Sequence, residues 1–158
     1  MTEQPVHELT LTRLIAAPPP VVWRCWTEPE LIKQWFTPRP WTSPVVDIDL
    51  RPGGANRMIF RGPNGEEFVN RGVYLEIVPE RRLVFTDAYV SAWVPSAEPF
   101  MTAIVEFAGE GSGTRYGARV LHWSEEARKR HEERGFHQGW GKATDQLEEL
   151  ARRLAAGA

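Results

Sequence analysis

Residues 124–154, SEEARKRHEERGFHQGWGKATDQLEELARRL, carry the clearest structural signal in the chain. Apolar residues recur here at steps of four, three, four, three and four, at Phe136, Trp140, Ala143, Leu147, Leu150 and Leu154. This spacing is typical of one face of an amphipathic helix. Ser124 is a good N-cap, and Glu125 and Glu126 complement the helix dipole in the first turn. The sequence therefore predicts one long helix whose apolar stripe must be covered.

The chain before this helix alternates with a period of two. Six strands are predicted, at about 45–50, 56–61, 67–78, 82–89, 100–107 and 114–123, with 90–99 as a loop. Tight turns such as Pro52-Gly53-Gly54 and Gly62-Pro63-Asn64-Gly65 join several of them, which favours an antiparallel meander. A first strand at 7–15 and two short helices, at about 19–27 and from 29 to about 35, precede the six strands.

This order, β-α-α-β-β-β-β-β-β-α, predicts an α+β fold in which a curved antiparallel sheet wraps around the C-terminal helix. Its 158 residues suit a single domain spanning 1–158. A sheet curved around a helix often leaves a gap, so an internal cavity is expected between the two.

Composition excludes several classes of protein. The net charge of −2 gives no broad basic surface for a phosphate backbone, so no nucleic-acid partner is expected. The N-terminal residues show no signal peptide, and no apolar run approaches the roughly 18 residues that span a bilayer, so we expect a cytoplasmic protein without a membrane partner. The single cysteine, Cys25, rules out a Cys-rich zinc site and reads as a buried, inert thiol.

Several motifs, in this order, resemble the activator of Hsp90 ATPase homologue-like family of the START-like (SRPBCC, helix-grip) superfamily. They are 21–36 with its Pro29-Glu30 turn, the DLRPGG turn at 49–54, the hairpin 72–86, Gly113-Thr114-Arg115 and Gly139-Trp140. The resemblance covers about residues 9–154 and implies the helix-grip fold. We interpret Gly139 as permitting close approach of helix and sheet. Asn56 departs from the family pattern, where an aromatic is common, which implies a more polar or more open pocket.

Catalytic motifs are sparse. His122 shares strand parity with inward-facing residues and is a candidate general acid or base at a cavity mouth, with a hydrogen-bonded structural histidine as the alternative. Asp87 lies on an otherwise apolar face, for which a structural hydrogen bond is favoured over catalysis. His131 and His137 lie on different helix faces, so the run from His131 to Arg134 is interpreted as solvated and no metal site is expected.

The apolar parity of strands and helix predicts a ligand pocket. The expected lining residues are Met58, Phe60, Phe68, Asn70, Tyr74, Phe85, Tyr89, Met101, Ala103, Phe136 and Trp140. For each of them plain core packing is an equal alternative. Together they contain more aromatic and methionine bulk than a minimal core needs, which suits a lipid-like or polyketide-like ligand bound without a cofactor.

The sequence suggests three functions, which we give in order of preference. The first is binding of an apolar or aromatic small molecule. The second, implied by the family, is a co-chaperone-like module that contacts a chaperone. The third, also implied by the superfamily, is a cyclase or dehydratase using His122 or Asp87. Trp41 and Trp93 fall in loop-like segments, and exposed aromatic residues often mark interfaces, so a homodimer is also expected.

Overall fold

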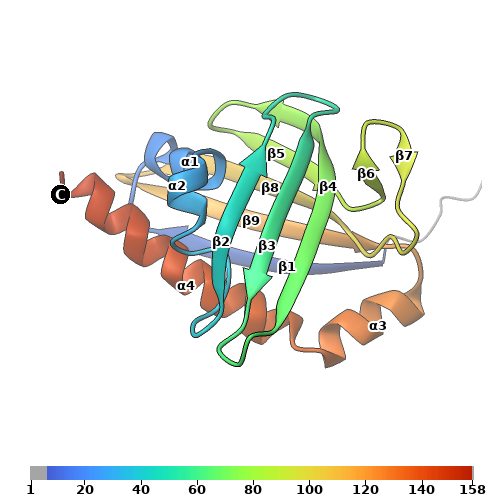
Figure 1. Cartoon of the computed structure of the whole chain (residues 1–158). Helices are drawn as coiled ribbons and strands as arrows, with labels where there is room; N and C mark the ends of the chain where they lie inside the picture. The colour runs from blue at the N-terminus through green and yellow to red at the C-terminus, as the bar shows by residue number, and fades with distance from the viewer. Residues whose placement is uncertain (1–6, 158) are drawn as a thin grey trace, which may run out of the picture.

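The computed structural model describes residues 7–157 and shows a strongly curved sheet wrapped around a C-terminal helix (Figure 1). The sheet has seven strands: β1 (His7–Ile15), β2 (Thr42–Ile48), β3 (Ala55–Arg61), β4 (Glu67–Val78), β5 (Arg82–Thr86), β8 (Thr102–Glu110) and β9 (Gly113–His122). All neighbours pair antiparallel, in the order β1-β9-β8-β5-β4-β3-β2. The predicted α+β architecture is confirmed.

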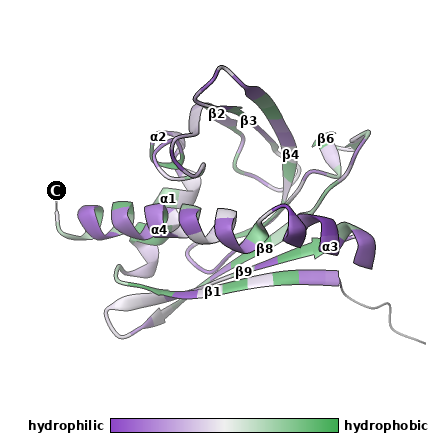
Figure 2. Cartoon of the chain, turned by 90° about the horizontal axis from the view of Figure 1, so that it is seen from below, coloured by the Kyte–Doolittle hydropathy of each residue, from purple (hydrophilic) through white to green (hydrophobic). Residues whose placement is uncertain are grey.

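Four helices accompany the sheet: α1 (Pro19–Thr27), α2 (Pro29–Ile32), α3 (Glu125–Glu133) and α4 (Phe136–Ala155). Seen from below, β1, β8 and β9 lie on one side of α4 and β2, β3 and β4 on the other (Figure 2). The apolar stripe of α4 is covered as predicted, because Phe136, Ala143, Leu147 and Leu150 are all buried.

The bend of the sheet has local causes. The pairing of β4 with β5 slips between Tyr74 and Glu76, and such irregularities bend a strand. Gly72 lies at a close approach, since a Cβ there would come within 2.4 Å of the carbonyl oxygen of Thr86. The turn before β3 also depends on glycine: Gly53 has a φ of +81°, and a Cβ on Gly54 would collide with the Asp49 carbonyl oxygen.

The predicted single helix over 124–154 is wrong in one respect, because it is divided into α3 and α4. Gly135 adopts a φ of +97°, a left-handed conformation that ends one helix before the next begins. The predicted N-cap is confirmed, since Ser124 Oγ accepts a hydrogen bond from the backbone N–H of Ala127 at 3.0 Å. No residue of α3 is buried, and Figure 2 shows this helix as mostly hydrophilic.

The segment 90–99, predicted as a loop, instead contributes to a small separate hairpin. Its strands are β6 (Tyr89–Ser91) and β7 (Val94–Pro95), with Trp93 in the turn between them. The preceding strand ends at Thr86 rather than at Tyr89. The six predicted strands after the short helices therefore all exist in the main sheet, and the hairpin is an addition.

The core between α1, α4 and the sheet is rich in tryptophan. Trp26 and Trp35 pack edge to face with ring centroids 4.9 Å apart, and Trp35 Nε1 donates to the Cys25 carbonyl oxygen at 2.8 Å. The burial predicted for Cys25 is confirmed, and it raises the pKa of the thiol to about 12. No helix within residues 7–157 is both long and apolar enough to cross a membrane.

Candidate functional site

An aromatic groove of about 500 Å³ lies between α4 and the concave face of the sheet. The residues that line it are Trp26, Trp35, Phe36, Thr37, Pro38, Trp41, Phe60, Phe68, Asn70, Phe85, Met101, Gly139, Trp140 and Ala143. Small-molecule sites are typically concave and mostly apolar, of this order of volume, with few polar groups. This aromatic groove is the best candidate for a functional site.

Three parts of the chain supply the walls. Gly139, Trp140 and Ala143 lie on the face of α4 that is turned toward the sheet. Phe60 and Phe68 are direct cross-strand partners on β3 and β4, so strand pairing itself places these two rings together. The third wall is the segment 35–41, which runs from the end of the short helices to β2.

The segment 35–41 is tied to α4 by one buried side chain. Gln146 Nε2 donates to the carbonyl oxygens of Trp35 at 2.9 Å and Thr37 at 2.8 Å, and its Oε1 accepts from the backbone N–H of Arg39 at 2.9 Å. These bonds satisfy backbone groups that no strand or helix pairs. Gln146 therefore fixes the rim of the aromatic groove against the helix.

An aromatic pair stands at the rim. Trp41 stacks on Phe68 with ring centroids 5.8 Å apart and planes inclined by 26°. Phe68 remains 60% exposed, whereas Trp41 is half-buried. Trp41 is thus partly covered within the chain, and the interface role expected for it stays a prediction.

A smaller inner pocket adjoins the groove. Its free volume is about 10 Å³, and its walls are Trp26, Ile32, Phe36, Asn56, Met58, Tyr74 and Phe85. Trp26, Phe36 and Phe85 line both spaces, so they form the partition between them. Asn56 is only 7% exposed, and its Nδ2 donates to Tyr74 Oη over a long 3.4 Å. Burial raises the pKa of Tyr74 above its ordinary value, which keeps the hydroxyl protonated.

The residues that line the groove determine which interactions it can make with a ligand. Among the described residues that line the groove or the inner pocket, none carries a charge. The polar side chains are Thr37, Asn70, Asn56, Tyr74 and the indole N–H groups. Such walls bind by apolar contact, aromatic packing and a few hydrogen bonds.

The structure distributes the predicted lining residues over four places. Phe60, Phe68, Asn70, Phe85, Met101 and Trp140 line the groove. Met58 and Tyr74 line the inner pocket. Ala103 and Phe136 pack against Leu9 and Val120 in a filled cluster. Tyr89 lies instead in the β6–β7 hairpin with its ring 5.9 Å from Trp93, because β5 ends before it, and it lines neither the groove nor the inner pocket.

Eight of the fourteen groove residues lie outside the predicted set, and six of these are in segments that period-two alternation does not identify. Trp26, Trp35, Phe36, Thr37, Pro38 and Trp41 come from α1 and the segment after α2. The density of aromatic residues in 23–41 was the available signal. Gly139 was misread: a Cβ there would meet nothing within 4 Å, so the residue opens space rather than permitting close approach.

The two catalytic candidates lie outside the groove. Asp87 Oδ1 accepts from the backbone N–H groups of Phe100 at 2.7 Å and Met101 at 3.0 Å, the structural role favoured for it. His122 is buried, with Nδ1 3.1 Å from the carbonyl oxygen of His7 and Nε2 2.9 Å from His131 Nδ1.

His131 is not the solvated residue predicted from its helix. Its ring lies 4.6 Å from that of Phe100 and 5.1 Å from that of Phe136, between the sheet and the two C-terminal helices. Burial, followed by the nearby His122 and Arg134, lowers its pKa to about 4. No cluster of three or more His, Cys, Asp or Glu side chains suited to a metal ion occurs in the described part of the chain.

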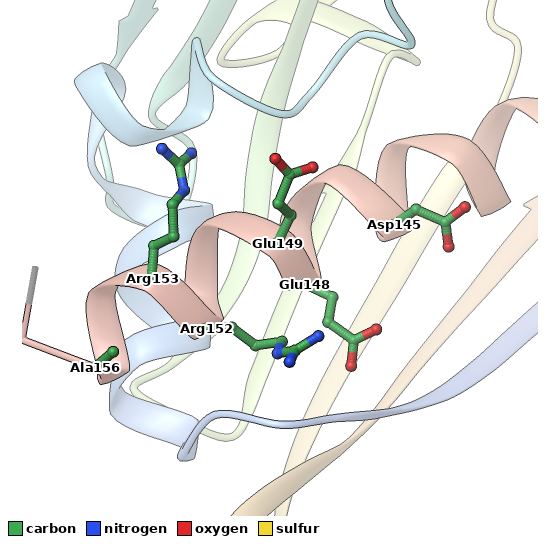
Figure 3. A pocket seen from close by; sticks show the side chains of 6 residues that line it. All are labelled: Asp145, Glu148, Glu149, Arg152, Arg153 and Ala156. Carbon is green, nitrogen blue, oxygen red and sulfur yellow. The ribbon is translucent and has the colours of Figure 1, made fainter.

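A second hollow, of about 590 Å³, runs along the opposite, solvent-facing side of α4. Figure 3 shows Glu149 and Arg153 pointing to one side of the helix and Glu148 and Arg152 to the other, so these charges do not converge. Asp145 forms an ion pair with Arg13 at 2.5 Å. This surface is a solvated helix face rather than a site.

A curved antiparallel sheet closed by a C-terminal helix, with an apolar groove between them, defines the helix-grip class of protein. The family described as "Activator of Hsp90 ATPase homolog 1-like protein" matches residues 16–152. The chain belongs to this family, as its turn and hairpin motifs predicted.

Solved structures agree with this assignment. A crystal structure of a protein from Nitrosomonas europaea has 45% sequence identity and a TM-score of 0.91, covering 94% of this chain and 96% of that one. One from Mycobacterium smegmatis has 26% identity and a TM-score of 0.78, covering 93% and 95%. One from Chromobacterium violaceum has 24% identity and a TM-score of 0.74, covering 90% of this chain and 96% of that one, and it shares the fold. No curated protein matches the chain.

Proposed function

We propose that this protein binds an uncharged, apolar or aromatic small molecule in the aromatic groove. The observation that carries the proposal is the groove itself: about 500 Å³ between helix and sheet, walled by rings from three separate parts of the chain. A concave, mostly apolar surface of this size is typical of small-molecule sites. The aromatic lining that includes Trp140 and Phe60 favours a ligand as its contact.

Gly139 supports the same conclusion from the side of the helix. Glycine inside a helix costs about 1 kcal/mol relative to alanine. No neighbouring atom requires it here, because a Cβ would meet nothing within 4 Å among the described residues. A residue that weakens its helix and keeps the groove open is best explained by what occupies the groove.

The absence of charge from the described lining narrows the ligand class. Moving a carboxylate or ammonium group from water to an apolar site without a partner is strongly unfavourable. A neutral ring system is therefore favoured over a fatty-acid carboxylate. The predicted lipid-like or polyketide-like ligand is retained only in its uncharged forms.

The test is a fluorescence titration with N-phenyl-1-naphthylamine, a neutral aromatic probe that brightens in apolar surroundings. Wild type should bind it saturably, and Gly139→Leu should weaken binding about tenfold or more by filling the groove. Gly141→Leu is the matched control, since Gly141 lies in the same helix, has open space around it and does not line the groove. Equal binding by all three proteins would refute the proposal.

One observation favours a second function, a protein-interaction module of the kind that the family description implies. Trp93 is 84% exposed in the turn of the β6–β7 hairpin and holds a φ of +62°, which is strained for a non-glycine residue. Tryptophan is enriched among the residues that contribute most to binding at protein–protein interfaces. The partner of Trp93 would be a chaperone or a second copy of the chain. If this is correct, Trp93→Ala abolishes a measurable stimulation of Hsp90 ATPase or a dimer seen in native mass spectrometry; wild type showing neither would remove this alternative.

A further inference from the structure

The inner pocket contains a polar pair that its surroundings do not satisfy. Asn56 Oδ1 is buried and has no hydrogen-bond partner among residues 7–157. Its Nδ2 reaches only Tyr74 Oη, at 3.4 Å, which is long for a hydrogen bond. We call these two side chains the Asn56–Tyr74 pair.

A buried polar atom left without a partner costs about 1–3 kcal/mol. Such atoms are rare in native structures and call for a specific explanation. The strand position gives none: Asn56 stands among apolar neighbours, with Ile32 and Met58 in the same pocket wall. An apolar residue at this position would make the folded protein more stable, so we infer that the amide serves a purpose other than folding.

The chemistry of the Asn56–Tyr74 pair defines its complement. Asn56 Oδ1 is an acceptor. If Tyr74 Oη accepts from Asn56 Nδ2, the hydroxyl proton of Tyr74 is still available as a donor. A group that donates one hydrogen bond and accepts another fits both. A hydroxyl does this in the smallest volume, and the pocket offers about 10 Å³, roughly the space of one water-sized group.

The pocket also lies where a ligand in the groove could reach it. Trp26, Phe36 and Phe85 face both spaces, and Phe85 lies between Trp26, at 5.7 Å, and Tyr74, at 6.5 Å between ring centroids. Because the two spaces share these three side chains as a wall, a short substituent on a flat ring in the groove would point toward the inner pocket where the rings part.

We propose that the ligand is an uncharged aromatic alcohol, whose ring occupies the groove and whose hydroxyl donates to Asn56 Oδ1 and accepts from Tyr74 Oη. This inference rests on the proposed binding function and adds the ligand class and its orientation. Burial, which keeps the Tyr74 hydroxyl protonated, supports it as the donor.

The test compares two probes of nearly equal size, 2-naphthol and 2-methylnaphthalene, by displacement of N-phenyl-1-naphthylamine from the wild-type protein. The hydroxyl should improve affinity about tenfold, the equivalent of one or two net hydrogen bonds. Tyr74→Phe and Asn56→Leu should each remove this preference while 2-methylnaphthalene still binds, which also shows that the variants are folded.

Tyr116→Phe is the matched control. Tyr116 is as deeply buried as Tyr74, yet it lines neither the groove nor the inner pocket, so its variant should keep the preference for 2-naphthol. Equal affinity of wild type for both probes would overturn the inference and leave the binding function standing. Failure of both probes and of N-phenyl-1-naphthylamine would overturn the binding function itself. A crystal structure with 2-naphthol in the groove and only water against Asn56 would also overturn the hydroxyl assignment.

Discussion

Asn56 and Gly139 both line the groove or its inner pocket, and the local environment of each conflicts with plain folding. Asn56 buries an amide among apolar side chains, and Gly139 weakens a helix beside open space. Local conflicts of this kind tend to occur at functional sites, where stability has been exchanged for binding. Both residues border the same groove and its inner pocket, which is why we assign them a common purpose.

The double variant Asn56→Leu/Tyr74→Phe should therefore unfold no more easily than wild type. Replacing both partners of a poorly satisfied buried pair by apolar groups is nearly neutral or stabilising, whereas removing one partner alone is not. Chemical denaturation should place the free energy of unfolding of the double variant within about 1 kcal/mol of wild type or above it. A loss of about 3 kcal/mol would mean that the pair is a structural network.

Which residues line the groove could be predicted only in part from sequence. Phe136 and Trp140 are one turn apart on the same stripe of α4, yet Phe136 is packed in a filled cluster and Trp140 borders the groove. Periodicity reports which face is buried, but not whether the buried face meets protein or open space. That distinction depends on segment 35–41, whose path follows from long-range bonds to Gln146.

At the scale of elements, the rim segment 35–41 depends on Gln146. Gln146→Leu removes three hydrogen bonds to this segment and leaves its backbone groups without that partner, so we expect a loss of about 1–3 kcal/mol in unfolding free energy. Probe affinity should also fall, because Trp41 and Pro38 lie on the released rim. Gln138→Leu, an exposed position of the same helix, should change neither quantity. If Gln146→Leu bound the probe as tightly as wild type, the rim segment would not be part of the binding site.

Helix α3 provides a pH-dependent contact through His131. Its pKa of about 4 lies below the ordinary 6.5, so the unfolded chain takes up a proton at a higher pH than the folded one. The stability from this residue is complete above about pH 6.5 and is lost as pH falls toward 4. Between pH 7 and pH 5 this loss is about 1 kcal/mol after allowance for solvent screening, or roughly 3 °C in Tm.

Thermal unfolding of His131→Gln should show a correspondingly smaller decrease in Tm over that range. His137→Gln, at an exposed histidine six residues away, serves as the control and should keep the full decrease. An identical pH profile for wild type and His131→Gln would show that this contact does not titrate on unfolding. The interpretation of His131 as solvated failed because its neighbours, His122 at the end of β9 and Phe100 before β8, lie outside its own helix.

Across the whole molecule, the sequence was most informative where patterns are regular. Alternation located all six strands after the short helices, and the stripe from Phe136 to Leu154 located α4. The sequence does contain a signal for the break at Gly135, because residues 125–134 contribute almost no apolar side chains to that stripe. The single-domain reading of 1–158, the cytoplasmic location and the homodimer stay predictions.

The other proposals depend on the aromatic groove being a ligand site. A crystal structure of the protein saturated with N-phenyl-1-naphthylamine would show whether the groove is occupied. The probe should lie between Trp140 and Phe60, with a ring edge toward the partition formed by Trp26, Phe36 and Phe85. An unoccupied groove, with the probe bound instead against the β6–β7 hairpin or another surface, would contradict the claim.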